Sequence, residues 1–121
     1  MANILVVDDE TSLLQLVTMI LGQAGHTVLS ASSGVEALMV FASYPHKFDL
    51  ILSDVLMPGM TGIELVRRIR ALDPSVKVLL MSGFVPEGVE VPGDLRLFKK
   101  PFAPADLLAT VKQELAANLE S

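Results

Sequence analysis

The chain has 121 residues, 51% of them hydrophobic, with a formal net charge of −5 and no cysteine. This length suits one domain with a real core, so we expect a single domain over residues 1–121. The absence of cysteine excludes disulfides and thiolate metal sites, and it suits a cytoplasmic protein. The acidic balance argues against direct nucleic-acid binding, and the sequence shows neither a basic leader nor an apolar run near the roughly 18 residues of a membrane span.

The first predicted strand is the apolar run over residues 4–7, which two acids, Asp8 and Asp9, follow directly. Short apolar runs separated by helical patterns are typical of buried parallel strands. Apolar residues then recur at helical spacing over 13–24, and Gly25 provides a stop. The chain therefore begins with a strand and a helix, with the acids between them.

The middle of the chain repeats this alternation. A helix should follow the Ser-Ser-Gly sequence at 32–34, and the next apolar run, 50–53, leads directly into a single acid, Asp54. The following helix has Thr61 as a good N-cap, and the Asp73-Pro dipeptide ends it. Asp54 thus lies at the end of a buried strand.

Two further apolar runs complete the pattern. Residues 76–81 precede Ser82, and residues 95–98 come shortly before Lys100. A final amphipathic helix opens at Pro104. Each predicted strand in this half is therefore followed closely by a polar residue.

The residues after the strands should converge, because the carboxyl ends of parallel strands share one edge of the sheet, where ligands of open α/β sheets bind. They comprise three acids, one hydroxyl and one lysine: Asp8, Asp9, Asp54, Ser82 and Lys100. Three carboxylates at one point repel one another by about 1 to 4 kcal/mol per pair. A hard divalent cation, Mg²⁺ above all, is the natural partner, and Mg²⁺ commonly takes substrate phosphate oxygens. The site therefore indicates phosphoryl chemistry.

In this arrangement the chain resembles the CheY-like receiver domain of two-component response regulators, essentially from end to end. The resemblance rests on five segments, which read ILVVDDE at 4–10, SSGVEAL at 32–38, DLILSDVLMPGMTG at 49–62, MSG at 81–83 and KKPF at 99–102. Each segment is a weak signal by itself, whereas all five in order, each at its strand end, are specific. The implied fold is α/β: a three-layer, doubly wound, five-stranded parallel sheet in the order 2-1-3-4-5, the flavodoxin-like receiver fold, with right-handed crossovers.

The resemblance also implies roles for the residues at the strand ends. Asp54 matches the phosphoacceptor, whose carboxylate attacks a phosphohistidine and becomes an aspartyl phosphate. Lys100 matches the lysine that pairs with it and then with the phosphoryl group. Ser82 matches the hydroxyl that reports the phosphoryl group. The peptide between Lys100 and Pro101 is expected to be cis.

The same resemblance implies a Mg²⁺ site. Asp9 and Asp54 match direct ligands, together with the backbone carbonyl of Leu56, and Asp8 matches a residue that holds the metal through water. In phosphoryl transfer a protein mainly aligns the nucleophile and neutralises charge on the equatorial oxygens, which a metal, a lysine and a hydroxyl can do.

The implied function is that of a signalling switch and not of an enzyme in the usual sense. Its expected partner is a histidine kinase or a phosphotransfer domain, with no direct nucleic-acid contact and no membrane segment in this chain. The run at 81–84 favours a receiver of a hybrid histidine kinase or a single-domain regulator. The sequence leaves open the cognate kinase, the pathway and the oligomeric state.

Two other functions are compatible with parts of the pattern. A phosphohydrolase could use Asp8 as its nucleophile with Glu10 two places on, although the chain has no spare length for the cap such enzymes carry. A receiver-shaped interaction module that never takes phosphate is the second alternative. Reaction with a small phosphodonor separates the three, by an adduct on Asp54, by turnover, or by no reaction.

The segment between Ser82 and Lys100 departs from the family. It is shorter than usual, and residues 84–93 contain two prolines and two glycines, which cost about 3 and 1 kcal/mol each inside a helix. We therefore predict that the family's fourth helix is shortened or absent. The family's switch aromatic is replaced by Leu97, with Phe98 on the opposite face of the strand, so phosphorylation should order or shift residues 84–94 without an aromatic rotamer switch.

Overall fold

The structure, a computed structural model, describes residues 2–44, 47–83, 88–100 and 102–116. Strands and helices alternate along these residues, as predicted. Their order is β1 (Asn3–Val7), α1 (Thr11–Gln23), β2 (Thr27–Ala31), α2 (Gly34–Ser43), β3 (Leu50–Asp54), α3 (Gly62–Leu72), β4 (Lys77–Ser82), β5 (Arg96–Lys99) and α4 (Pro104–Ala116).

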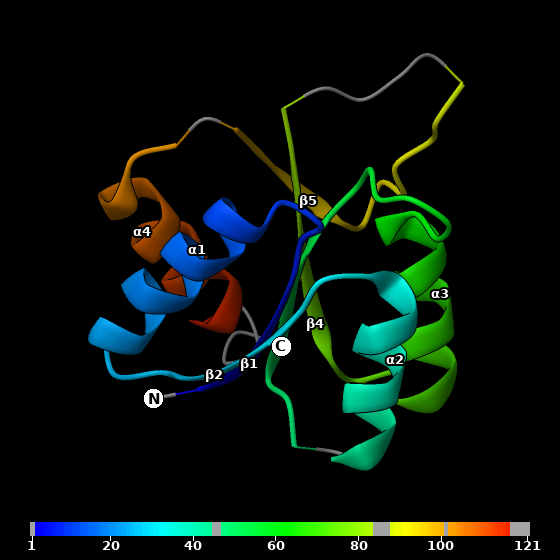
Figure 1. Ribbon diagram of the computed structural model, residues 1–121, viewed down its shortest axis with the longest axis horizontal. Helices are drawn as coiled ribbons and strands as arrows, with labels where there is room; N and C mark the ends of the chain where they lie inside the picture. Colours follow the sequence, from blue (N-terminus) through cyan, green and yellow to red (C-terminus); the bar gives the residue numbers. More distant parts are fainter. Residues whose placement is uncertain (1, 45–46, 84–87, 101, 117–121) are drawn as a thin grey trace.

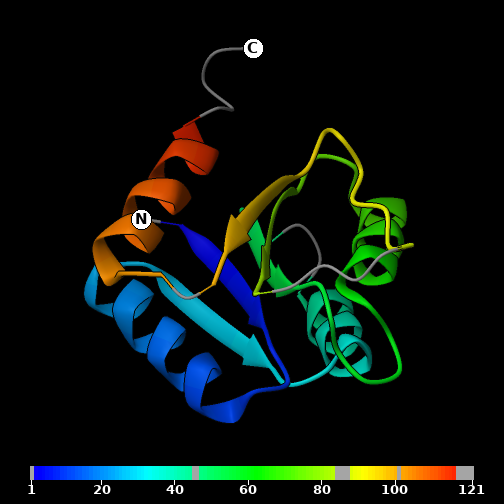
Figure 2. The same cartoon turned by 90° about the horizontal axis from the view of Figure 1, so that it is seen from above.

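The five strands form one parallel sheet in the order β2-β1-β3-β4-β5. Figure 1 shows this sheet between two pairs of helices. Helices α1 and α4 cover one face and α2 and α3 the other, which gives three layers (Figure 2). This arrangement confirms the predicted doubly wound α/β fold and its strand order. Because all strands run in parallel, their carboxyl ends lie along one edge.

The sheet is apolar on both faces because helices cover both. Leu5 and Val7 of β1 belong to the core beneath α2 and α3, whereas Ile4 and Val6 belong to the core beneath α1 and α4. The central strand β3 is buried along its whole length. Strands of this kind appear in a sequence as continuous apolar runs, which is why β3 was predictable.

Local signals set the helix boundaries. The hydroxyl of Thr61 accepts a hydrogen bond of 3.2 Å from the Glu64 backbone N–H, which confirms the predicted N-cap of α3. Gly25 has a φ of 97°, a left-handed conformation that favours glycine after a helix end. No helix among the described residues is both long and apolar enough to cross a membrane.

The connection from β4 to β5 has turns and no helix in its described part, residues 83 and 88–95. The prediction that the family's fourth helix is shortened or absent is confirmed for these described residues. The helix labelled α4 follows β5 and is therefore a different helix from the family's fourth. Residues 84–87 and Pro101, with its predicted cis peptide bond, lie outside the described residues. Leu97 packs against the core under α2 and α3, and Phe98 against the opposite core, as the alternation of a strand requires.

Candidate functional site

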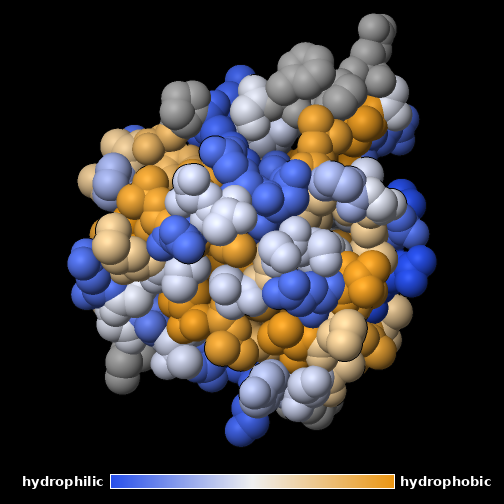
Figure 3. Space-filling view, viewed as in Figure 1, coloured by the Kyte–Doolittle hydropathy of each residue, from blue (hydrophilic) through white to orange (hydrophobic). Residues whose placement is uncertain are grey.

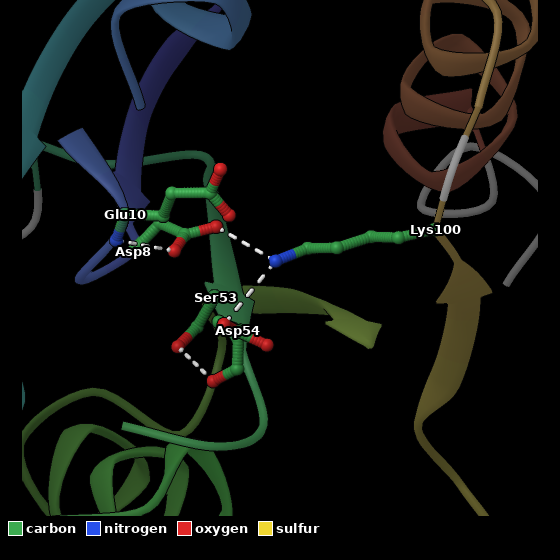
Figure 4. A network of polar contacts seen from close by, with 5 residues as sticks. All are labelled: Asp8, Glu10, Ser53, Asp54 and Lys100. Atoms are coloured by element: carbon green, nitrogen blue, oxygen red, sulfur yellow. Dashed lines mark hydrogen bonds and ion pairs between the residues drawn. The ribbon is translucent and has the colours of Figure 1, made fainter. Parts of the chain in front are cut away.

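A lysine joins two carboxylates at the carboxyl edge of the sheet (Figure 4). Asp8 follows β1, Asp54 ends β3, and Lys100 follows β5. The Nζ of Lys100 lies 2.9 Å from Oδ2 of Asp8 and 3.2 Å from Oδ2 of Asp54. Three residues that are far apart in the sequence thus form one charged cluster, as predicted.

Hydrogen bonds that involve the backbone hold Asp8 and Asp54 in place. The N–H of Asp8 donates to the carbonyl of Ala31 at the end of β2, at 3.1 Å. The Oδ1 of Asp8 accepts from the Glu10 N–H at 2.9 Å, so the turn into α1 fixes this side chain. On β3, the hydroxyl of Ser53 donates to the backbone carbonyl of Asp54 at 2.9 Å.

Ser82 lies beside this cluster at the end of β4. Its side chain is buried, and its backbone carbonyl accepts a 3.0 Å hydrogen bond from the Lys100 N–H. In the sheet register Asp54 is opposite Met81, the residue before Ser82. The structure therefore brings Ser82 to the same edge as the lysine and the acid, where the sequence placed it.

Burial dominates the electrostatics of Asp54. It raises the pKa of the carboxyl, the charge of Asp8 adds to this rise, and the Lys100 ammonium and the Leu56 N–H oppose it. For Lys100, burial lowers the pKa, but the hydrogen bond to Asp8 and the charge of Asp54 outweigh burial and leave the pKa raised. The lysine is thus held as an ammonium, while Asp54 lacks enough positive charge to offset its burial.

The donor set fits a hard cation. Asp8, Asp9 and Asp54 each offer one carboxylate oxygen, and these oxygens lie within 4.8 Å of one another. Asp9 is exposed, whereas the other two acids are buried. Carboxylate oxygens with an open side for water are the ligands that Mg²⁺ takes in proteins. A metal-binding role for the Leu56 carbonyl stays a prediction.

A cavity of about 510 Å³ opens beside the lysine. Its wall combines residues of α1 with the segments after β4 and β5. The lining residues are Glu10, Leu13, Leu16, Gly83, Lys100 and Phe102. The cluster is therefore reachable from outside along the α1 side, and a reacting group has room next to the Lys100 ammonium.

One residue that shapes the site was not recognised as such in the sequence. Gly62, the first residue of α3, packs so closely on β3 that a Cβ there would collide with the backbone carbonyl of Asp54 and approach Cα of Val55. Its N–H donates to the carbonyl of Val55 at 2.8 Å. Its place at the end of the DLILSDVLMPGMTG segment was an available signal.

Residues 4–112 match the family model of the response regulator receiver domain. The chain is 35% identical over 118 residues to the sensor kinase CckA of Brucella abortus (strain 2308), a match that covers 94% of this chain and 12% of the kinase. It is 31% identical over 121 residues to the response regulator receiver protein CpdR of the same organism, covering 97% of this chain and 99% of that protein.

A solved structure shows the same fold. Response regulator protein TrrA of Thermotoga maritima, crystallised in complex with Mg(2+)-BeF, is 31% identical and superimposes with a TM-score of 0.79 over 93% of this chain and 98% of that chain. The chain is thus similar to nearly the whole of one short protein and to about an eighth of a long kinase.

Proposed function

The chain belongs to the response regulator receiver domain family, and from this premise we propose that it accepts a phosphoryl group on Asp54 from a histidine kinase or a phosphotransfer domain, in a magnesium-dependent reaction, and signals by a change of conformation. The observation that carries the proposal is the Lys100 ammonium between the carboxylates of Asp8 and Asp54. Such an arrangement favours a site that receives further negative charge.

Of the two buried acids, Asp54 is the better nucleophile. Asp8 is 1% exposed, and both its oxygens are engaged, by Lys100 and by the Glu10 N–H. Asp54 lies at the end of the central strand, with one oxygen paired to Lys100. An Asp54 oxygen would attack the phosphorus of a phosphohistidine, and the P–N bond would break with its electron pair going to the imidazole, which takes up a proton.

Lys100 and a metal would share the task of neutralising charge. Asp8, Asp9 and Asp54, with the carbonyl of Leu56, would hold Mg²⁺, which when bound supplies positive charge to the carboxylates and to phosphoryl oxygens. Lys100 supplies a second positive charge from the β5 side and would pair with a phosphoryl oxygen after transfer. The raised pKa of Asp54, caused first by burial, is the imbalance that such charge relieves.

The response would begin at Ser82. Its hydroxyl sits at the end of β4, and its carbonyl is bonded to the Lys100 N–H, so a bond from this hydroxyl to the phosphoryl group would pull on the segment that follows. The described residues 88–95 of that segment contain turns, which reorder more readily than a helix. We also propose that the protein is cytoplasmic, where it would meet a histidine kinase or a phosphotransfer domain.

Incubation with Mg²⁺ and a small phosphodonor, followed by intact-mass measurement, tests the proposal. One phosphoryl adduct is expected, and Asp54→Asn should abolish it. Asp49→Asn is the matched control, because Asp49 precedes the same strand at its other end and should leave the adduct unchanged. An undiminished adduct in Asp54→Asn would exclude Asp54 as the acceptor.

The same experiment separates the rival functions. Steady release of phosphate that depends on Asp8 and persists in Asp54→Asn would indicate a phosphohydrolase with Asp8 as its nucleophile. A wild-type chain that binds Mg²⁺ but never gains an adduct would indicate an interaction module. Omission of Mg²⁺ should prevent the adduct, and an adduct that forms equally well with a chelator present would contradict the metal requirement.

A further inference from the structure

The two outer strands of the sheet differ in how they are protected. Strand β5 reads RLFK, is four residues long, and has exposed Arg96 and Lys99 at its two ends. Strand β2 reads TVLSA, is five residues long, and contains neither charge nor proline, although four of its residues are exposed or half-buried. Charges and short length are the usual means by which an edge strand avoids pairing with another chain. By these criteria β5 is protected and β2 is open.

The open side of β2 carries backbone groups that can form a ladder. The Thr27 N–H donates to the carbonyl of Ala2, and the carbonyl of Ala31 accepts from Asp8, so these residues face β1. Backbone direction alternates along a strand, and Val28 and Ser30 therefore direct their N–H and C=O groups away from β1. In the sheet formed by the described residues, β2 is the last strand on that side.

The surface around this edge is nearly free of charge. Residues 11–44, which span α1, β2 and α2, contain one charged side chain, Glu36, whose carboxylate accepts a hydrogen bond from Ser32 at 3.0 Å. Figure 3, drawn in the view of Figure 1, shows hydrophobic side chains interspersed with polar ones over β2 and its flanking helices. Loss of charge at the centre of a surface is the compositional mark of an interface.

Apolar side chains border the edge on the α2 side. Leu29 is 38% exposed and Tyr44 49% exposed. Both line a hollow of about 290 Å³, in which Lys47 is the one charged lining residue. The lining residues are Asn3, Thr27, Leu29, Tyr44, Lys47 and Phe48. A short apolar side chain from outside could enter this hollow next to Leu29.

We infer that this face binds a second copy of the chain, with the two β2 strands paired antiparallel across a two-fold axis into a continuous ten-stranded sheet. The axis would pass between Leu29 and the partner's Leu29. Val28 would then exchange backbone hydrogen bonds with the partner's Ser30, and Ser30 with the partner's Val28. This contact is isologous and closes after two copies.

Charge favours a second copy at this face over other contacts between copies. The chain carries a net charge of −5, so two copies repel one another in general. Pairing through β5 would bring Arg96 and Lys99 of two copies together, which is unfavourable. The β2 face adds no such repulsion and offers the same donors, acceptors and apolar side chains on both sides.

Analytical ultracentrifugation of the full chain, from about 1 μM to about 1 mM, measures this association. The average mass should rise from 13.0 kDa toward twice that value and no further. Leu29→Lys and Leu29→Glu should each weaken association by about tenfold or more, because like charges would face one another on the axis. An equimolar mixture of the two variants should associate again. Leu72→Lys, an exposed leucine on α3, is the matched control and should associate as the wild type does.

A measurement without mutation guards against loss of folding in the variants. The amides of Val28 and Ser30 should exchange more slowly with solvent at high chain concentration than at low, whereas amides of β5 should not change. A monomer at every concentration would overturn the inference and leave the face to a different protein or a lipid surface. Masses beyond two copies, undiminished association of Leu29→Lys, or a mixture that fails to associate although both variants are folded would overturn it as well.

Discussion

The amino ends and the carboxyl ends of the strands lie along two opposite edges of the sheet, and the two edges use polar side chains in different ways. At the amino edge, where β1, β2 and β3 begin, side chains bond to the backbone: Asp49 accepts from the Asn3 N–H at 2.8 Å, and the Asn3 amide donates to the Lys47 carbonyl at 2.9 Å. At the carboxyl edge, charged side chains face one another, with Lys100 between Asp8 and Asp54. The first arrangement completes the fold, and the second concentrates charge that the fold does not need.

This contrast suggests how a functional edge can be distinguished from a structural one. A polar group that satisfies an unpaired backbone donor or acceptor contributes to stability about as much as any hydrogen bond, roughly 1 kcal/mol. Burial raises the pKa of a carboxylate such as that of Asp54, so its charged form is disfavoured, and a bound positive charge would offset this cost. Substitutions at the two edges should therefore separate stability from activity.

The largest expected effect is at the carboxyl edge. Lys100→Met should slow phosphorylation by a small phosphodonor by about 10²- to 10³-fold, because it removes a positioned donor from the site of developing charge. Lys99→Met is the control, since Lys99 is an exposed neighbour on β5. Rates are measured by intact mass against time. Equal rates in the two variants would break the proposed division between the edges.

The next effect concerns the backbone that holds Asp54. Gly62→Ala should lower the free energy of unfolding by about 1 to 3 kcal/mol, because the new Cβ meets the Asp54 carbonyl and the Val55 backbone, which cannot move aside cheaply. Gly22→Ala places a methyl group in open space within α1 and should raise stability by about 0.5 to 1 kcal/mol. Denaturant unfolding measures both changes. A neutral Gly62→Ala would show that α3 does not press on the site.

The sequence predicted the carboxyl edge better than the amino edge, for a physical reason. Strand β3 is covered on both faces, so it appears as an apolar run, and the acid that ends it stands out. Strand β2 is an outer strand with a mixed pattern, and its residues were not identified from periodicity; its place came from the family resemblance. The close packing of Gly62 on Asp54 depends on how a helix meets a strand, which spacing along the chain does not contain.

The hydrogen bonds at the amino edge could not be predicted from the sequence either. Asp49 and Asn3 are 46 positions apart, and nothing in either segment signals that one side chain bonds the backbone of the other. Similarly, the bond from the Glu10 N–H to Asp8 could be expected only as a general preference for acids at helix starts. Side-chain to backbone bonds of this kind are determined by the assembled fold.

A smaller effect is expected from the amino edge itself. Asp49→Ala should lower the free energy of unfolding by about 1 kcal/mol through loss of the bond to the Asn3 N–H. Asp49→Asn keeps an acceptor and should cost less. Neither variant should change the phosphorylation rate once the protein is folded. A rate that falls with stability in this pair would mean that the two edges are coupled and would blur the comparison.

The smallest effect is a pH dependence at the amino edge, where Nδ1 of His26 accepts from the Ala2 N–H at 3.2 Å. Burial lowers the pKa of His26 from its ordinary value of 6.5, so the unfolded chain binds a proton more readily than the folded one. The stability from this group is therefore fully present above pH 6.5 and is lost as the pH falls through the lowered pKa of the folded state. Unfolding curves between pH 7 and pH 5 should show a steeper loss for the wild type than for His26→Asn, which keeps an acceptor but does not titrate. Parallel losses of stability in the two proteins would mean that His26 does not cause the pH dependence. Phosphorylation rates should not distinguish the wild type from His26→Asn at any pH in this range.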